Sequence, residues 1–130
     1  YSKLEWIDKH LLKIRLRPKI RISDKPIDKN IAKIFLEERI NELAGKFDFV
    51  YNKVTIRNQK TRWGSCSSKN NINLNMQLMN IPNHLIDYVL MHELVHTVIK
   101  SHSTLFWLTL DRYIDNAKAL DKELKNYSLT

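Results

Sequence analysis

His92, Glu93 and His96 form an HExxH pattern, and His102 follows after five further residues. Residues four apart on a helix differ by about 400° of rotation and about 6 Å of rise, so His92 and His96 face one side and can bind one metal ion. Glu93 lies beside them, in reach of a metal-bound water molecule, which is the position of a general base. The pattern predicts hydrolysis in which zinc lowers the pKa of water and polarises a carbonyl group.

A third histidine completes the candidate ligand set. The HExxH segment is predicted to be helical, because its apolar residues recur at spacings of three and four and Pro82 suits a first turn. Residues 100–103 interrupt this pattern, and a second helix is expected after Ser103 as its N-cap. His102 would then lie in the turn between two helices. From there it can supply a third nitrogen and leave one metal position open for catalysis.

Other interpretations of the histidines stay open at this point. They could be ordinary helix residues without a metal, or they could form a structural metal site without turnover. The five-residue gap equals that of the metzincins, which have glycine at its third position, where this chain has Ile99. A β-branched residue there predicts a longer helix or a different bend. One zinc ion per chain is expected, with another divalent metal as the alternative.

The neighbourhood of these histidines resembles a known family, the YgjP-like family of metal-dependent hydrolases. The residues that carry the resemblance are the segment Thr61–Cys66 (TRWGSC), Asn75 with Leu78, Tyr88 with Val89, Ser103, and Phe106 with Trp107. The resemblance covers residues 24–130. It implies a zincin-like metallopeptidase core, with zinc held by His92, His96 and His102 and with Glu93 as the catalytic base.

The remaining pattern predicts an α+β fold, in which helices pack on a small antiparallel sheet and HExxH lies on a central helix. Strands are expected at 54–56 and at 72–78, where apolar residues alternate, with a polar turn at 67–71. A helix is expected from Asp24 to Gly45, with glycine as its stop. Its predicted core face consists of Ile27, Ile31, Ile34, Phe35 and Leu43.

A peptide or protein substrate is expected, and an edge strand of the sheet could bind its backbone by strand addition. Two weaker candidates for substrate contact are Arg62, whose guanidinium suits a carboxylate or phosphate, and Asn75. Each has a structural alternative, as a brace beneath the hairpin or as a locally bonded strand residue. Candidate partners for the second ring nitrogen of a ligand histidine are Asp87, Asp111 and Asp115.

Positive charge is concentrated before the predicted helices. Residues 1–21 hold seven Lys or Arg and two Asp or Glu, in a chain of net charge +8. Between Lys13 and Arg21 basic and apolar residues alternate, which allows a nucleic-acid contact or a solvated strand edge. Family members usually carry a β-rich stretch before the core, and this chain starts at Tyr1. Residues 1–23 are therefore interpreted as a basic segment, the remnant of such a region, and residues 24–130 as the hydrolase domain.

Composition is that of one globular domain: 130 residues, 43% hydrophobic, with two Gly and three Pro. No apolar run reaches the roughly 18 residues that a membrane helix needs, so no membrane contact is predicted. The single Cys cannot form an internal disulfide, and a reducing, cytoplasmic setting is expected. Cys66 is expected to be a packed thiol and not a metal ligand.

Overall fold

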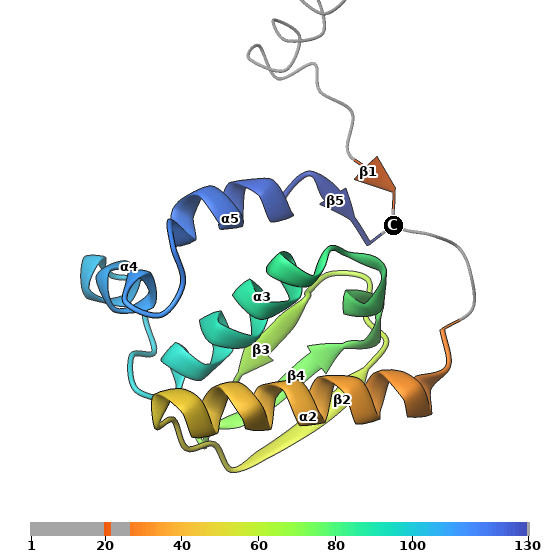
Figure 1. The fold of residues 1–130 in the computed structure, drawn as a ribbon, viewed down its shortest axis with the longest axis horizontal. Coiled ribbons are helices and arrows are strands. Elements are labelled where there is room, and N and C mark those ends of the chain that lie inside the picture. The colour runs from red at the N-terminus through yellow and green to blue at the C-terminus, as the bar shows by residue number, and fades with distance from the viewer. Residues whose placement is uncertain (1–19, 22–26, 130) are drawn as a thin grey trace, which may run out of the picture.

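The computed structural model describes residues 20–21 and 27–129 (Figure 1). Helix α3 (Asn83–His96) contacts α2, α4, α5 and β3, and ten of its fourteen residues are buried. The α+β fold with HExxH on a central helix is thus confirmed. The other elements are β1 (Ile20–Arg21), α2 (Lys29–Phe47), β2 (Lys53–Arg57), β3 (Gly64–Cys66), β4 (Asn71–Asn75), the 3₁₀ helix η1 (Met76–Asn80), α4 (Thr104–Asp111), α5 (Ala117–Leu124) and β5 (Tyr127–Ser128).

The basic segment predicted for residues 1–23 lies outside the described residues, apart from Ile20 and Arg21. These two pair in parallel with Tyr127 and Ser128, so β1 and β5 form a two-stranded sheet (Figure 1). Among the described helices, none combines the length and the apolar character that crossing a bilayer requires.

The main sheet is mixed, which corrects the expected antiparallel arrangement. Strand β4 lies in the middle and pairs in parallel with β2 and antiparallel with β3. In this register Ile72 of β4 stands between Val54 of β2 and Cys66 of β3. Alternating apolar residues reveal which face of a strand is buried, but not the direction of the neighbouring strand. The parallel direction of β2 relative to β4 depends on how the chain runs from β2 to the β3–β4 hairpin.

Strand β4 ends at Asn75, earlier than the apolar alternation predicts. The Asn75 Oδ1 atom accepts a hydrogen bond from the backbone N–H of Gln77 at 3.0 Å and starts η1. Met76 and Leu78 are nevertheless buried, at 8% and 0% exposure. The apolar alternation at 72–78 therefore predicts the buried residues correctly, but Met76 and Leu78 belong to the 3₁₀ helix η1 and not to the strand.

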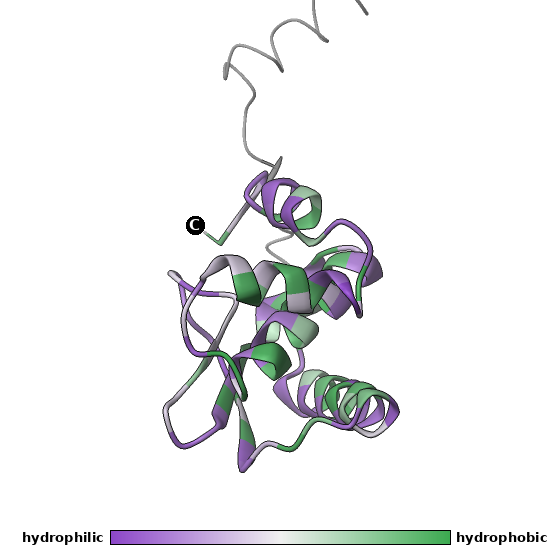
Figure 2. Cartoon of the chain, turned by 90° about the vertical axis from the view of Figure 1, so that its left-hand side faces the viewer, coloured by the Kyte–Doolittle hydropathy of each residue, from purple (hydrophilic) through white to green (hydrophobic). Residues whose placement is uncertain are grey.

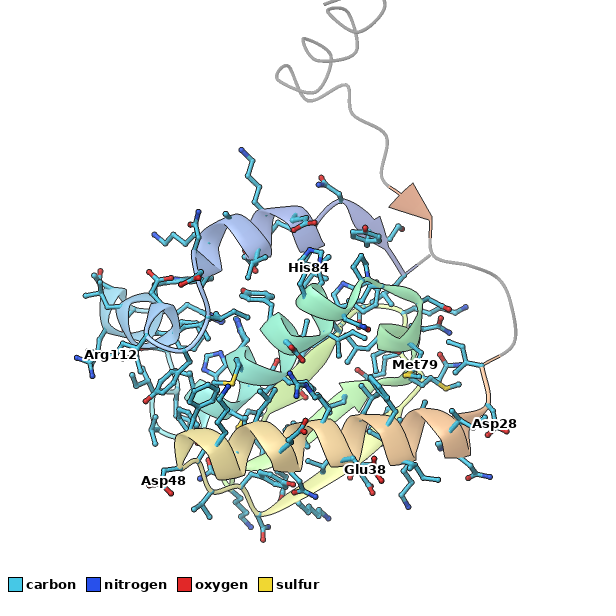
Figure 3. The ribbon with its side chains drawn as sticks, viewed as in Figure 1. Asp28, Glu38, Asp48, Met79, His84 and Arg112 are labelled. Carbon is cyan, nitrogen blue, oxygen red and sulfur yellow. The ribbon has the colours of Figure 1, made fainter. Side chains whose placement is uncertain are left out.

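Helix α2 begins and ends at aspartates, one at each end of the helix in Figure 3. At its start, Asp28 Oδ1 accepts from the N–H groups of Asn30 and Ile31, at 2.8 and 3.3 Å, which is an N-cap. At its end, Asp48 adopts the left-handed conformation (φ 64°) and donates its N–H to Ala44. The expected start at Asp24 and stop at Gly45 are therefore wrong, because Asp28 provides the cap and Asp48 takes the left-handed position.

The core face of α2 also differs from the prediction. The buried residues are Ala32, Leu36, Ile40, Leu43 and Ala44. Ile31, Ile34 and Phe35 of the predicted stripe are 60%, 59% and 40% exposed, while Leu43 is buried and Ile27 packs partly against the core. Figure 2, which views α2 nearly along its axis, shows hydrophobic residues on more than one side of it. Two sets of apolar residues on α2 have helical spacing. The set that contains Ala32 and Ala44 packs against the core, and the set that contains Ile31 and Phe35 is exposed.

An ion pair joins α2 to the central helix. Arg39 donates from Nε to Asp87 Oδ1 and from Nη2 to Asp87 Oδ2, both at 2.8 Å. Arg39 also contacts Glu42 one turn further on. These two carboxylates raise the pKa of the guanidinium, which stays charged. Both carboxylate oxygens of Asp87 thus bind a side chain of α2.

Candidate metal centre and active site

The three predicted histidines converge. His92 and His96 lie one turn apart near the end of α3, and His102 comes from the turn before α4. The Nε2 atom of His92 is 3.1 Å from that of His96 and 3.2 Å from that of His102, and the third pair, His96 and His102, is 3.0 Å apart. The structure therefore brings all three candidate ligands to one point.

This donor set fits a metal ion. A tetrahedral zinc ion with nitrogen ligands at about 2.0–2.1 Å requires neighbouring nitrogens about 3.3 Å apart, close to the separations found here. Burial, with the nearby His96 and His102, lowers the pKa of His92 to about 3. Burial also lowers the pKa of His96. Both rings are neutral at physiological pH, so each has a nitrogen lone pair to offer.

The opposite ring nitrogens have partners that hold the rings in place. His96 Nδ1 lies 2.8 Å from the carbonyl oxygen of Ile99, and His92 Nδ1 lies 3.2 Å from the hydroxyl of Tyr88. That hydroxyl donates to Asp121 Oδ1 on α5 at 2.9 Å. Tyr88 is 1% exposed, and burial, with the charge of Asp121, raises its pKa, so the phenol keeps its proton.

These contacts replace those expected from three other aspartates. Asp87 binds Arg39, and Asp111 Oδ1 accepts from the backbone N–H of Ala117 at 2.9 Å. Asp115 is exposed and makes no described contact with a ligand histidine. Spacing along the chain could not identify Asp121, because it follows the motif by more than twenty residues and belongs to no pattern.

The bend after α3 explains how His102 returns without a glycine. The helix ends at His96, and the N–H groups of Val98 and Ile99 both reach the carbonyl of Val95, at 3.0 and 2.9 Å. Ile99 is not among the described non-glycine residues of positive φ. The alternative of a different bend is therefore the one the chain adopts. Ser103 then caps α4, its Oγ accepting from the N–H of Phe106 at 3.4 Å.

Two aromatic residues of α4 support the histidine rings. Phe106 is fully buried and stacks on His96, with ring centroids 4.4 Å apart and planes inclined by 18°. Trp107 is half-buried and lies against His102, with centroids 6.3 Å apart. Phe106 belongs to the hydrophobic core, and Trp107 packs against it. They are also the platform on which the candidate ligands rest.

Glu93 lies between the central helix and the edge strand. It is 5% exposed, and burial raises the pKa of its carboxyl to about 8, although the charge of Arg62 opposes the shift. Strand β3 approaches it at Gly64, where a Cβ atom would stand 3.1 Å from Glu93 Oε2 and 3.2 Å from the carbonyl oxygen of Asn73. The glycine of the TRWGSC segment thus leaves room for the carboxylate, a role that the motif alone did not reveal.

A cavity of about 190 Å³ opens beside Glu93. Its lining includes Arg62, Trp63 and Gly64 from the chain around β3, and His92 and Glu93 from α3. The first of the weaker substrate candidates, Arg62, therefore lies at the cavity, and its side chain is exposed.

Asn75, the second candidate, is placed differently. It is 1% exposed, and its amide group donates to the carbonyls of Gln59 and Arg62 at 2.7 and 2.8 Å. With its oxygen bound to Gln77, the side chain is fully engaged within the protein. Asn75 therefore braces the loop that carries Arg62, in keeping with its structural alternative as a locally bonded strand residue.

The turn after α3 is also tied to the hairpin. Lys100 Nζ donates to the carbonyl of Ser67 at 3.0 Å and contacts Asn70. Its distance to Cys66 Sγ is 4.0 Å. Burial raises the pKa of the Cys66 thiol, and this residue packs against the core. Cys66 is the packed thiol that was expected and lies outside the candidate ligand set.

Comparison with known proteins defines the class first. The structure is similar to that of the metallopeptidase zymogen of Pyrococcus abyssi abylysin, with a TM-score of 0.59, 24% identity, and coverage of 69% of this chain and 92% of that chain. It is also similar to the zymogen of Methanocaldococcus jannaschii jannalysin, with a TM-score of 0.58, 25% identity, and coverage of 69% and 91%. The fold is that of a zincin-like metallopeptidase.

The family follows from the sequence. Residues 25–127 match the model of the YgjP-like metallopeptidase domain. The chain belongs to this family, as the TRWGSC segment and the residues around HExxH indicated. No curated protein matches the sequence. The comparisons lend no support to nucleic-acid binding, a hypothesis that rests on residues 13–21.

Proposed function

We propose that this chain is a zinc-dependent metallopeptidase in which His92, His96 and His102 hold one divalent ion and Glu93 is the general base. The convergence of three Nε2 atoms beside a buried carboxylate is the main support. Three imidazoles with a fourth position open are a ligand set of catalytic zinc. Another divalent metal would bind the same nitrogens, so zinc is proposed on ligand chemistry alone.

Bound zinc would supply a lowered pKa for water and a polarised carbonyl group. The proton transfers are proposed to be carried out by a side chain of the protein, Glu93. Glu93 takes a proton from the attacking water and returns it to the nitrogen of the breaking amide bond. Burial raises the pKa of its carboxyl to about 8, so the carboxyl can hold a proton. A base of this kind can keep the proton between the two transfers.

The substrate is proposed to be a peptide or protein segment in extended conformation. Within the described part of the chain, β3 pairs with β4 alone, so its other edge can bind a peptide backbone. The same strand begins at Gly64, beside Glu93. A peptide along β3 would therefore pass the catalytic carboxylate. Arg62, on the wall of the cavity, is proposed to favour an acidic side chain in the substrate.

Two measurements test this function. The first is elemental analysis of protein purified without added metal, for the wild type and for a His92→Ala, His96→Ala double variant. About one zinc per chain is expected in the wild type and none in the variant. Absence of metal from the wild type, even after reconstitution, would overturn the proposal.

The second measurement is turnover of a peptide library by the wild type and by Glu93→Gln. Removal of a general base typically costs about 10²–10⁴-fold in rate, so Glu93→Gln should bind zinc normally and lose most of its activity. A structural metal site predicts something else, namely no turnover by either protein. The residues selected around the cleaved bond would show whether an acidic side chain is preferred.

A further inference from the structure

One ligand histidine is linked, through a tyrosine on its own helix, to a carboxylate on a different helix. His92 Nδ1 contacts the Tyr88 hydroxyl at 3.2 Å, and that hydroxyl contacts Asp121 Oδ1 at 2.9 Å. Tyr88 lies one turn before His92 on α3, whereas Asp121 lies on α5. His96 differs, because its Nδ1 faces the backbone carbonyl of Ile99. Of these two ligands, only His92 has its outer ring nitrogen in contact with a side chain, which a substitution can change.

The direction of the hydrogen bonds follows from the carboxylate. An ionised Asp121 can only accept, so the Tyr88 proton is donated to it. The phenol oxygen then has only lone pairs to offer His92, whose Nδ1 must carry the hydrogen. Neutral imidazole has one N–H, so the lone pair is at Nε2, directed at the Nε2 atoms of His96 and His102. The opposite tautomer would direct a hydrogen into the ligand cluster and prevent metal binding.

We propose that Asp121, acting through Tyr88, is a positioning residue that selects the metal-binding tautomer of His92. This inference rests on the proposed three-histidine metal site. Loss of such a partner typically weakens metal binding by about 10–100-fold. An amide at position 121 is especially informative, because its NH₂ group can donate to the phenol oxygen. Tyr88 would then be free to donate to His92 Nδ1 and to stabilise the wrong tautomer.

The chain offers a matched control on the same two helices. Glu123, also on α5, contacts His84 Nε2 on α3 at 2.9 Å. Glu123→Gln therefore makes the same chemical change and weakens an α3–α5 contact, but leaves Tyr88 and His92 alone. Any effect of Asp121→Asn that comes merely from looser packing of α5 should appear in this control as well.

The first experiment measures zinc affinity by competition with a chromophoric chelator. We expect Asp121→Asn to bind about 10–100-fold more weakly than the wild type, and Tyr88→Phe to be weakened as well. Asp121→Glu, which keeps an acceptor-only carboxylate, should recover part of the affinity, and Glu123→Gln should stay within about twofold of the wild type. A folded Asp121→Asn variant with wild-type affinity would overturn the proposal.

The second experiment is independent of metal binding and activity. Long-range ¹⁵N–¹H correlation spectra of the metal-free chain distinguish the two imidazole tautomers. In the wild type, and in Glu123→Gln, His92 should carry its hydrogen on Nδ1, and in Asp121→Asn this population should fall. If the wild type bound no zinc, the proposed function would fail while these spectra still decided the tautomer. A wild-type ring with its hydrogen on Nε2 would refute the inference.

Discussion

At the scale of single residues, the site depends on how closely its parts approach one another. Glu93 is held between α3 and β3, and Gly64 makes this approach possible because a side chain there would touch the carboxylate. The histidine rings have equally little freedom, since Tyr88 and Ile99 bind their outer nitrogens and Phe106 stacks beneath them. Chemistry that requires aligned groups is sensitive to displacements of this size.

Gly64→Ala is therefore expected to impair catalysis without removing the metal. Its Cβ would stand 3.1 Å from Glu93 Oε2 and 3.3 Å from Cγ, so the carboxylate must shift by a few tenths of an ångström. We expect kcat/KM to fall by about 10–100-fold, while zinc content stays at the wild-type level. Steady-state kinetics with a cleaved peptide, together with elemental analysis, measures both.

Gly45→Ala is the matched control for this substitution. Apart from the backbone of its own helix and its two chain neighbours, no atom of the described residues lies within 4 Å of a Cβ built at Gly45, so the added methyl group meets open space. Its kcat/KM should equal that of the wild type. A Gly64→Ala enzyme as active as this control would show that Glu93 tolerates the displacement.

At the scale of elements, α3 carries the chemistry and its neighbours set the geometry. Helical spacing puts the two ligands of α3 on one side of the helix, but the third depends on the bend after His96 and on the cap at Ser103. Lys100 ties that bend to the β3–β4 turn through Ser67. Helix α5 contributes Asp121. The site therefore requires several elements to pack correctly around one.

Helix α2 offers a test of local stability that is separate from the site. Gly45 lies inside α2, two residues before its end, and is exposed. A glycine in a helix interior costs about 0.5–1 kcal/mol relative to alanine, because its unfolded backbone has more freedom. Gly45→Ala should raise the free energy of unfolding by about this amount. Urea unfolding curves would contradict it if their midpoint did not rise.

At the scale of the whole molecule, the hydrophobic core is built without the histidines. Residues of α2, the sheet and α3 are fully buried together, among them Leu36, Leu74, Leu90 and Leu94, with Phe106 of α4. A metal ion would add a link between the end of α3 and the following turn. The fold is therefore expected to persist without metal, in contrast to small domains that are unfolded in the absence of zinc.

Removal of the metal should thus lower stability without unfolding the chain. Binding to the folded state alone stabilises it by about 2.7 kcal/mol when free metal is 100 times the dissociation constant. We expect chelation to lower Tm, with no change in far-UV circular dichroism at 25 °C, and readdition of zinc to restore Tm. Loss of the helical signal on chelation would indicate instead a structural metal site.

Much of the chemistry could be predicted from the sequence because it is local. HExxH places His92, Glu93 and His96 by helical spacing alone, and the break before Ser103 predicted that His102 would lie in a turn. The α+β class and the central helix followed from apolar periodicity, and the family from the residues around the histidines. Each of these inferences uses relations between residues close in the chain, where backbone geometry leaves few alternatives.

The rest required the tertiary structure, because it depends on contacts between distant segments. Two apolar stripes of α2 have the same periodicity. In the packed fold Ala32, Leu36 and Ile40 are buried, whereas Ile31 and Phe35 are exposed. The parallel pairing of β2 with β4 is likewise invisible to strand periodicity. The hydrogen bonds of Asn75 with Arg62, and of Tyr88 with Asp121 between α3 and α5, join residues that are far apart in the chain. Sequence spacing determines which residues can share a face, whereas only the packed fold decides what that face meets.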